Sequence, residues 1–304
     1  LVKRFDTRRR WPGARHLPRG GPAYSRDCHR AVGGAPLRYD LSGAMSDDSI
    51  LTSRDGGVLT LTLNRSAAFN SFTRPMAAAL QARLDEAARD DSIRCVVLTG
   101  EGKAFCAGQD LKEVTADDAP PLEDIVHGTY NTTVRKMRAL AKPVIAAVNG
   151  VAAGAGANIA LAADLCVATE SARFIQAFSK IGLIPDSGGT WMLPKLIGLQ
   201  RATALAYLGT PVGAADAESM GMIHRALPDA DFADGVRALA HQLAAMPTRG
   251  LALTKAAFNA GFEQGLDAQL DTEMKLQAEA SRTDDYAEGV AAFLEKRTPT
   301  FQGH

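Results

Sequence analysis

The chain has 304 residues, of which 46% are hydrophobic and 22% are charged, and its formal net charge is +0. This composition is that of a globular protein long enough for one large domain or two smaller ones. The balanced charge gives no general reason to expect a nucleic-acid partner. No apolar run approaches the roughly 20 residues needed to span a bilayer, so no membrane insertion is expected.

Residues 1–44 differ from the rest because arginine, glycine and proline are frequent and no apolar period is present. We interpret this segment as a disordered basic tail. A transit peptide and a nucleic-acid-binding arm are the alternative interpretations. The run Met45-Ser46-Asp47-Asp48 resembles a natural start, which would make the tail translated upstream sequence.

From residue 49 onward, strand patterns alternate with helix patterns. A hairpin is predicted over 49–54 and 58–64, around the turn Asp55-Gly56-Gly57. The other predicted strands are at 93–98, 144–149, 164–169 and 223–227. The predicted helices are an alanine-rich helix after Gly156 and those at 74–89, 124–141, 199–208, 214–220, 231–245, 250–260, 266–279 and 286–294. This alternation predicts an α/β fold with a core at 46–235 and a helical C-terminal region at 236–304.

The cysteines and histidines indicate no metal site. Four cysteines, Cys28, Cys95, Cys106 and Cys166, form no CxxC pair, and none of the six histidines forms an HxxH pair. Cys95 and Cys166 lie in apolar strand patterns and are predicted to be buried thiols, as in a reducing compartment.

Two loops share one construction, in which an apolar strand is followed by small residues and a helix start. They lie at 106–110 and 153–156. The first amides of a helix are unpaired, and the helix dipole there favours negative charge. If the two starts converge, two N–H groups can donate to one oxygen, as an oxyanion hole requires. Each loop alone is weak evidence, because a tight strand-to-helix turn explains it as well or better.

Two other catalytic interpretations do not fit the motifs. The sequence Gly154-Ala155-Gly156 lacks the third glycine of a dinucleotide fingerprint, since Ile159 stands in its place. No GxSxG motif is present, and Ser187 has no evident histidine partner, so serine hydrolase chemistry is not expected.

Several motifs follow one another along the chain: LTLNR at 61–65, FN at 69–70, AFCAGQDL at 104–111, KPVIAAVNGVAAGAGANIALAAD at 142–164 and GLIPDSGGTWMLP at 182–194. In this order they resemble the motifs of the crotonase (enoyl-CoA hydratase/isomerase) superfamily. The resemblance extends from about residue 50 to the C-terminus. It implies a spiral of ββα units with a C-terminal helical oligomerisation region, assembled as a homotrimer or a hexamer. It also implies acyl-CoA substrates, with coenzyme A as part of the substrate and no separate cofactor.

The resemblance also implies roles for individual residues. By motif match, the backbone N–H groups of Gln109 and Ala155 would hold the thioester oxygen as it becomes an enolate. The two glutamates of family hydratases are replaced here by Asn158 and Phe178, neither of which can act as a carboxylate base. Asp186, at a turn that family isomerases use for their acid/base, remains as the single carboxylate, and an apolar pocket would raise its pKa. In isolation, Asp186 would be an ordinary turn aspartate.

Further residues are expected to contact the acyl-CoA. In chain order they are Arg65, Phe69, Ala104, Gly108, Asp110, Leu111, Asn158 and Phe178, with Phe293 or Lys296 of the last helix as additions, including to a neighbour's site. Asp110 is also expected to cap the helix after Gln109. Tyr130 and Trp191 are interpreted as core residues, or else as lining of the acyl pocket, and Asp164 as structural.

The resemblance thus predicts a cytoplasmic acyl-CoA isomerase. AFCAGQDL and AFSKIGLIPDSGGTW match most closely the phenylacetate-catabolic branch of the family. That branch converts ring-1,2-epoxyphenylacetyl-CoA to oxepin-CoA, and such enzymes also move a double bond between the 3 and 2 positions of an enoyl-CoA. A hydratase is the alternative within the family. A non-catalytic protein that binds RNA through the basic tail is the alternative of another class.

Overall fold

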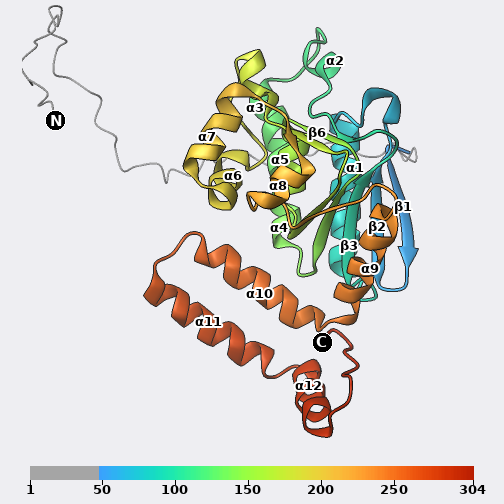
Figure 1. The fold of residues 1–304 in the computed structure, drawn as a ribbon, viewed down its shortest axis with the longest axis vertical. Helices are drawn as coiled ribbons and strands as arrows, with labels where there is room; N and C mark the ends of the chain where they lie inside the picture. Colours follow the sequence, from blue (N-terminus) through green and yellow to red (C-terminus); the bar gives the residue numbers. More distant parts are fainter. Residues whose placement is uncertain (1–47) are drawn as a thin grey trace, which may run out of the picture. The chain divides into compact units, whose positions relative to one another are not determined.

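The computed structural model describes residues 48–304, so the predicted basic tail at 1–44 and the predicted start at Met45 lie outside the described residues. The larger sheet has six strands. In spatial order they are β1 (Ile50–Asp55), β2 (Val58–Leu63), β3 (Cys95–Gly100), β5 (Val144–Val148), β7 (Leu165–Thr169) and β10 (Arg225–Leu227). The first two strands form the predicted antiparallel hairpin, and every other pair in this sheet is parallel (Figure 1).

A second sheet has four short strands. In spatial order they are β4 (Ala104–Cys106), β6 (Val151–Ala153), β8 (Arg173–Ile175) and β9 (Val212–Gly213). Three times in succession, the chain forms one strand of the larger sheet, then one strand of the smaller sheet, and then a helix. Those helices are α2 (Leu111–Val114), α5 (Ala155–Leu161) and the 3-10 helix η3 (Ala177–Ile181). Because β4 and β6 are parallel neighbours, the loops that leave them begin at the same edge of the sheet.

The other helices follow the predicted bounds, and none differs by more than two residues at either end. They are α1 (Arg74–Arg89), α7 (Leu199–Leu208), α8 (Ala214–Ser219), α9 (Phe232–Ala245), α10 (Thr248–Gly261), α11 (Leu266–Ala280) and α12 (Asp284–Glu295). The short η1 (Ser66–Ala68) and α6 (Gly189–Ile197) complete the set. Of the helices that the structure describes, none combines the length and the apolarity needed to cross a bilayer.

One predicted helix, over 124–141, is instead three consecutive helical segments. They are α3 (Leu122–Ile125), the π-helix η2 (Val126–Asn131) and α4 (Thr132–Ala139). Gln81 of α1 donates from Nε2 to the carbonyls of Gly128 at 2.9 Å and Thr129 at 3.2 Å. These bonds come from another helix and stabilise a wider turn, which hydrophobic periodicity within 124–141 cannot predict.

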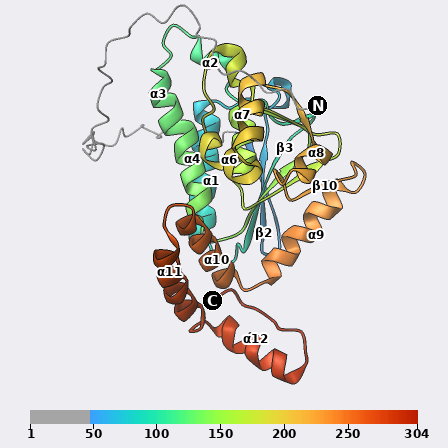
Figure 2. The same cartoon turned by 60° about the vertical axis from the view of Figure 1, so that its left-hand side comes forward.

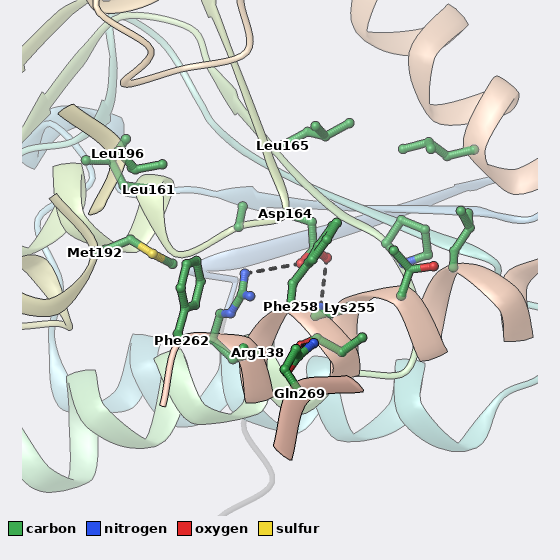
Figure 3. A pocket seen from close by; sticks show the side chains of 17 residues that line it. Arg138, Leu161, Asp164, Leu165, Met192, Leu196, Lys255, Phe258, Phe262 and Gln269 are labelled. Atoms are coloured by element: carbon green, nitrogen blue, oxygen red, sulfur yellow. Dashed lines mark hydrogen bonds and ion pairs between the residues drawn. The ribbon is translucent and has the colours of Figure 1, made fainter. Parts of the chain in front are cut away.

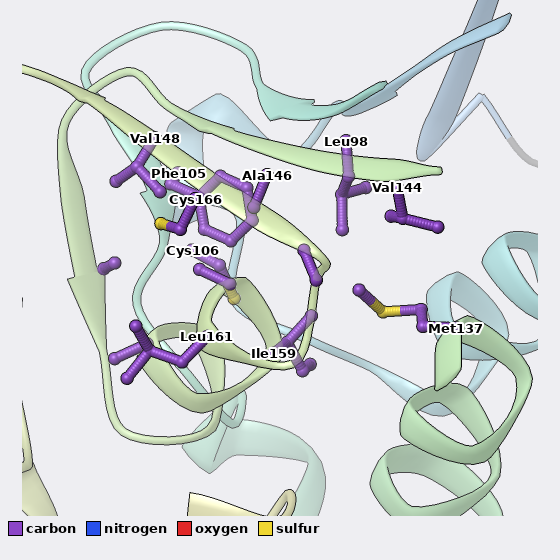
Figure 4. Packing of buried hydrophobic residues seen from close by; sticks show 14 of the residues in the cluster. Leu98, Phe105, Cys106, Met137, Val144, Ala146, Val148, Ile159, Leu161 and Cys166 are labelled. Carbon is purple, nitrogen blue, oxygen red and sulfur yellow. The ribbon is translucent and has the colours of Figure 1, made fainter. Parts of the chain in front are cut away.

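The core lies between the two sheets and around α5, whose seven residues are all buried. Figure 4 shows Ile159 and Leu161 of α5 packed near Phe105, Cys106 and Cys166. The predicted burial of Cys95 and Cys166 is confirmed, and Cys106 is buried as well.

Helix α9 covers the other face of the larger sheet with Val236, Ala240 and Ala244. The boundary predicted between residues 235 and 236 falls inside this helix, and the division into a core and a C-terminal region stays a prediction. Beyond α9, helices α10 and α11 lie side by side (Figure 2).

Candidate active site

The backbone of the 106–110 loop is fixed by a bridge to Phe72. Phe72 N donates to Gly108 O at 2.7 Å, and Asp110 N donates to Phe72 O at 2.9 Å. Gly108 adopts φ +95°, a left-handed conformation that favours glycine. This pattern directs the N–H of Gln109 away from Phe72, and none of the hydrogen bonds among residues 48–304 uses it.

The second loop turns at Gly154, with φ +54° and ψ −128°, into α5. Ala155 is the first residue of that helix, so its N–H has no acceptor within the helix. A Cβ on Gly108 would lie 3.6 Å from Ala155 N, so the two loops are in contact. The structure therefore brings Gln109 and Ala155 to neighbouring backbone segments, each with a free N–H. Their role as an oxyanion hole stays a prediction.

Asp186 lies in the turn before α6. Ser187, at φ +52°, donates from Oγ to Asp186 Oδ1 at 2.8 Å. Burial raises the pKa of the Asp186 carboxyl, and the hydrogen bond from Ser187 opposes that increase. Within residues 48–304, no lysine, arginine or histidine forms an ion pair with this carboxylate.

Asn158 connects α5 to the Asp186 turn and is 1% exposed. Its Nδ2 donates to the backbone carbonyl of Asp186 at 2.9 Å, and its Oδ1 accepts from Gln176 Nε2 at 2.7 Å. A Cβ on Gly189 would lie 2.2 Å from Asn158 Nδ2, so glycine is required at the start of α6. Both ends of the Asn158 amide are therefore used in holding the turn, and its predicted contact with substrate stays a prediction.

Phe178 is buried, and its ring lies beside the start of α5. A Cβ on Gly154 would be 3.9 Å from Phe178 Cζ. The ring thus places an apolar surface next to the residue that precedes Ala155.

Two of the predicted CoA contacts bind each other. Arg65 Nη2 lies 2.8 Å from Asp110 Oδ2, and Arg65 also donates to the carbonyl of Ser71. The Arg65 guanidinium holds the pKa of Asp110 below its usual value. Asp110 Oδ1 accepts from Lys112 N at 3.1 Å, which confirms the predicted cap of α2.

The remaining predicted CoA contacts lie on the same two segments. Phe69 O accepts from Ala107 N at 3.0 Å, and Phe69 is 54% exposed. Ala104 is buried, and its carbonyl accepts from Asn70 Nδ2 at 2.7 Å. The side chain of Leu111, by contrast, is 57% exposed. The structure therefore places segments 65–72 and 104–111 side by side.

Three other candidates lie on the C-terminal helices or against them. The ring of Trp191 on α6 packs edge-on against Phe262 at 4.9 Å between centroids, and Lys195 Nζ lies 3.5 Å from the Trp191 centroid. Phe293 on α12 is 81% exposed, and Lys296 caps that helix at φ +56°. No interaction described for residues 48–304 connects these side chains to Asp186.

Asp164 has the structural role predicted for it. Its carboxylate pairs with Arg138 at 3.2 Å and Lys255 at 2.8 Å, and it accepts from Val144 N at 2.9 Å. A cavity of about 610 Å³ lies beside this ion cluster and is lined mostly by apolar side chains, including Phe258 (Figure 3). This cavity contains none of the predicted catalytic residues.

Sequence reasoning missed the partners that hold the candidate residues in place. Gln109 Nε2 donates to Glu113 Oε2 at 3.2 Å, and Gln109 Oε1 accepts from the hydroxyl of Tyr130. The spacing of four residues between Gln109 and Glu113 could have indicated the bond between their side chains. Gln176 and Asn158 belong to different units, so no spacing could have revealed their bond. Among residues 48–304, no group of three or more His, Cys, Asp or Glu side chains could hold a metal ion.

Comparisons with known proteins agree with this architecture. Residues 53–304 match the sequence profile of a family described as enoyl-CoA hydratase/isomerase. The 1,2-epoxyphenylacetyl-CoA isomerase of Escherichia coli is 50% identical over 257 residues, which cover 84% of this chain and 98% of that protein. A protein of Rhodobacter capsulatus named probable enoyl-CoA hydratase is 45% identical over 247 residues, which cover 81% of this chain and 95% of that protein.

Solved structures show the same fold. The crystal structure of an enoyl-CoA hydratase from Bacillus anthracis matches with a TM-score of 0.81 at 34% identity, covering 84% of this chain and 100% of that one. The expected crotonase-like spiral of ββα units is confirmed.

Proposed function

This chain belongs to the enoyl-CoA hydratase/isomerase family, and we propose that it is an acyl-CoA isomerase with Asp186 as its acid/base. The substrate we favour is 1,2-epoxyphenylacetyl-CoA, because the Escherichia coli isomerase of that compound is 50% identical to this chain. A Δ3,Δ2-enoyl-CoA is the second substrate class, since both reactions move a proton next to a thioester or a vinylogous carbon.

The observation that carries this proposal is that Asp186 has no arginine partner within residues 48–304, whereas Asp110 and Glu113 each have one. Asp110 is paired with Arg65, and Glu113 is paired with Arg74. Asp186 accepts a hydrogen bond only from Ser187 among the described side chains, and burial raises its pKa. An ionised carboxylate without a cation is the better base, and its raised pKa makes its protonated form available as an acid.

In the proposed reaction, the Asp186 carboxylate removes a proton from the substrate. The negative charge then develops on the thioester oxygen, where the free N–H groups of Gln109 and Ala155 donate hydrogen bonds. Removing a donor of this kind typically costs roughly 3–4 kcal/mol of transition-state stabilisation. The protonated Asp186 then returns the proton to a different carbon, so one carboxyl group is sufficient.

The state of Asn158 supports isomerisation over hydration. Both ends of its amide are bound, to Gln176 and to the carbonyl of Asp186, so it neither ionises nor offers a free acceptor for water. Phe178 adds an apolar wall where hydration would need a second carboxylate.

The test of this proposal is Asp186→Asn, assayed for isomerisation of 1,2-epoxyphenylacetyl-CoA and of 3-enoyl-CoA thioesters. We expect kcat to fall by about 10²–10⁴-fold because the amide cannot accept the proton. Isomerisation at the wild-type rate would contradict the assigned role.

The second candidate function is an enoyl-CoA hydratase, which the names of the Rhodobacter capsulatus and Bacillus anthracis relatives favour. Hydration of crotonyl-CoA by the wild-type chain distinguishes the two functions. Substantial turnover would contradict the argument from Asn158 and Phe178.

The proposal also includes the cellular setting. Coenzyme A would enter as part of the substrate, and no separate cofactor would be needed. The buried free thiols of Cys95, Cys106 and Cys166 fit a reducing compartment, so we propose a cytoplasmic location. Assembly as a homotrimer or a hexamer remains part of the same proposal.

A further inference from the structure

Tyr130 occupies an unusual place at the edge of the candidate site. It lies in the π-helix η2, is 1% exposed and packs its ring 6.1 Å from that of Phe72. The carbonyls of the two preceding residues, Gly128 and Thr129, accept hydrogen bonds from Gln81 of α1. A buried side chain on a turn that another helix holds has little freedom to move.

The Tyr130 hydroxyl donates to Oε1 of Gln109. Nε2 of the same amide donates to Phe72 O at 3.3 Å and to Glu113 Oε2 at 3.2 Å. Glu113 is itself held by Arg74, whose N and Nε donate to its Oε1 at 3.0 Å and 3.1 Å. The Gln109 side chain is therefore bonded at both ends, and it belongs to the residue whose backbone N–H is free.

We propose that Tyr130 is a positioning residue, which holds the backbone N–H of Gln109 in place for the developing enolate through its hydrogen bond to the Gln109 side chain. This inference rests on the proposed function, because it assigns Tyr130 a part in the same reaction. Tyr130 does not touch the reacting atoms in this scheme.

The environment of Tyr130 suits a permanent donor and not a proton carrier. Burial raises the pKa of its hydroxyl, and the nearby charge of Asp186 raises it further. The phenol therefore keeps its proton over the whole working range of pH, and its hydrogen bond to Gln109 does not depend on pH.

The experiment compares Tyr130→Phe with the wild type in two measurements. The first is kcat and KM for isomerisation. The second is the ultraviolet band of the enolate formed by bound acetoacetyl-CoA, which measures oxyanion stabilisation without turnover. We expect kcat and the enolate fraction each to fall about three- to tenfold, the usual effect of one lost hydrogen bond, with KM nearly unchanged. Tyr207→Phe, at a 76% exposed tyrosine of α7, is the matched control and should change neither.

A double-mutant cycle separates positioning from general structural damage. Gln109→Met keeps the backbone N–H but removes both ends of the side-chain bond. If Tyr130 acts through this side chain, adding Tyr130→Phe to Gln109→Met should cost nothing further, whereas independent effects would add. Should Tyr130→Phe fail to fold, Gln109→Met alone must still lower the enolate fraction.

The inference is overturned if Tyr130→Phe folds and leaves kcat and the enolate band at wild-type levels, or if the two substitutions are additive. Failure of the proposed function looks different. In that case the wild type itself would neither isomerise the thioesters nor stabilise the enolate.

Discussion

Three carboxylates near the two loops differ in their immediate contacts. Asp110 and Glu113 each lie within ion-pair distance of an arginine, and Asp110 has a lowered pKa as a result. Among the described side chains, Asp186 accepts a hydrogen bond only from Ser187, and burial moves its pKa in the opposite direction. The same functional group is thus structural at two positions and available for proton transfer at the third.

The raised pKa of Asp186 has a consequence for stability. Below the unfolded-state pKa of an aspartate, about 3.9, both the folded and the unfolded states are protonated and there is no penalty. As pH rises towards the higher folded-state pKa, the unfolded chain loses its proton first, so stability falls and remains lower above that pKa. We therefore expect Asp186→Asn to be more stable than the wild type at pH 8, although its expected kcat is lower.

Urea unfolding of both proteins from pH 3.5 to pH 8 measures this effect. The advantage of the variant should shrink as pH falls through the folded-state pKa. Asp271→Asn, at an exposed aspartate of α11, is the control and should show no such pattern. A variant that is less stable than the wild type at pH 8 would contradict the pKa argument.

At the residue scale, the motifs predicted two neighbouring loops that carry Gln109 and Ala155, and the structure places those loops in contact. The motifs did not predict what holds them. The bond of Gln176 to Asn158 depends on how two units of the spiral pack, and that information is not local in sequence.

At the element scale, the start of α5 depends on close contact with β4. A Cβ on Gly156 would lie 2.3 Å from Cys106 O and 2.7 Å from Cys106 Sγ. Only glycine permits this approach, which places Ala155 next to Gly108. The small residue at position 156 is therefore required by packing.

Gly156→Ala should lower the free energy of unfolding by about 1–3 kcal/mol, the typical cost of overpacking a core. Turnover in the proposed isomerase assay should also fall, because α5 must move away from β4 and carries the Ala155 N–H with it. Chemical denaturation and kinetic assays measure the two effects.

The matched control is Gly250→Ala on α10, where a Cβ would meet Pro247 Cγ at an ordinary 3.7 Å. That substitution should be neutral or add up to about 1 kcal/mol through helix propensity. If Gly156→Ala and the wild type were equally stable, the close contact with Cys106 would not restrict the residue at position 156.

Most elements were predictable because their apolar periods are local. Helix α1, for example, buries Met76, Leu80 and Leu84 on one face and begins at the predicted residue. The π-helix was not predictable, since the Gln81 bonds that stabilise it come from another element.

At the scale of the whole described chain, an ion cluster contributes to attaching α10 to the core. Lys255 Nζ donates to Asp164 Oδ2 and to Met137 O, each at 2.8 Å, and to Lys142 O at 3.3 Å. Arg138 binds the other oxygen of Asp164. All three protons of Lys255 therefore have acceptors, so this lysine is structural although it borders a cavity.

Lys255→Met should lower the free energy of unfolding by about 2–4 kcal/mol, because it leaves buried carbonyls and part of the Asp164 charge without a partner. Urea unfolding measures the loss. Lys275→Met on exposed α11 is the control and should lie within about 0.5 kcal/mol of the wild type. A loss no larger than the control's would show that the Lys255 cluster does not contribute to attaching α10.

The C-terminal helices also carry large apolar side chains that are mostly exposed. They include Phe258, Leu266, Met274, Phe293 and Leu294. Exposed apolar faces of this kind typically mark interaction sites. They fit the predicted oligomerisation region, and the trimeric or hexameric state itself stays a prediction.

The two free amides of Gln109 and Ala155 belong to the main chain, and this has an evolutionary consequence. No point mutation other than one to proline can delete a backbone N–H, so these donors persist while the surrounding side chains change. Under the proposed function, substitutions at Asn158, Phe178 and Asp186 would exchange one proton-transfer reaction for another while the two proposed main-chain donors stay in place. A lineage with this architecture can diversify its reactions by changing a few side chains around an inherited main-chain site.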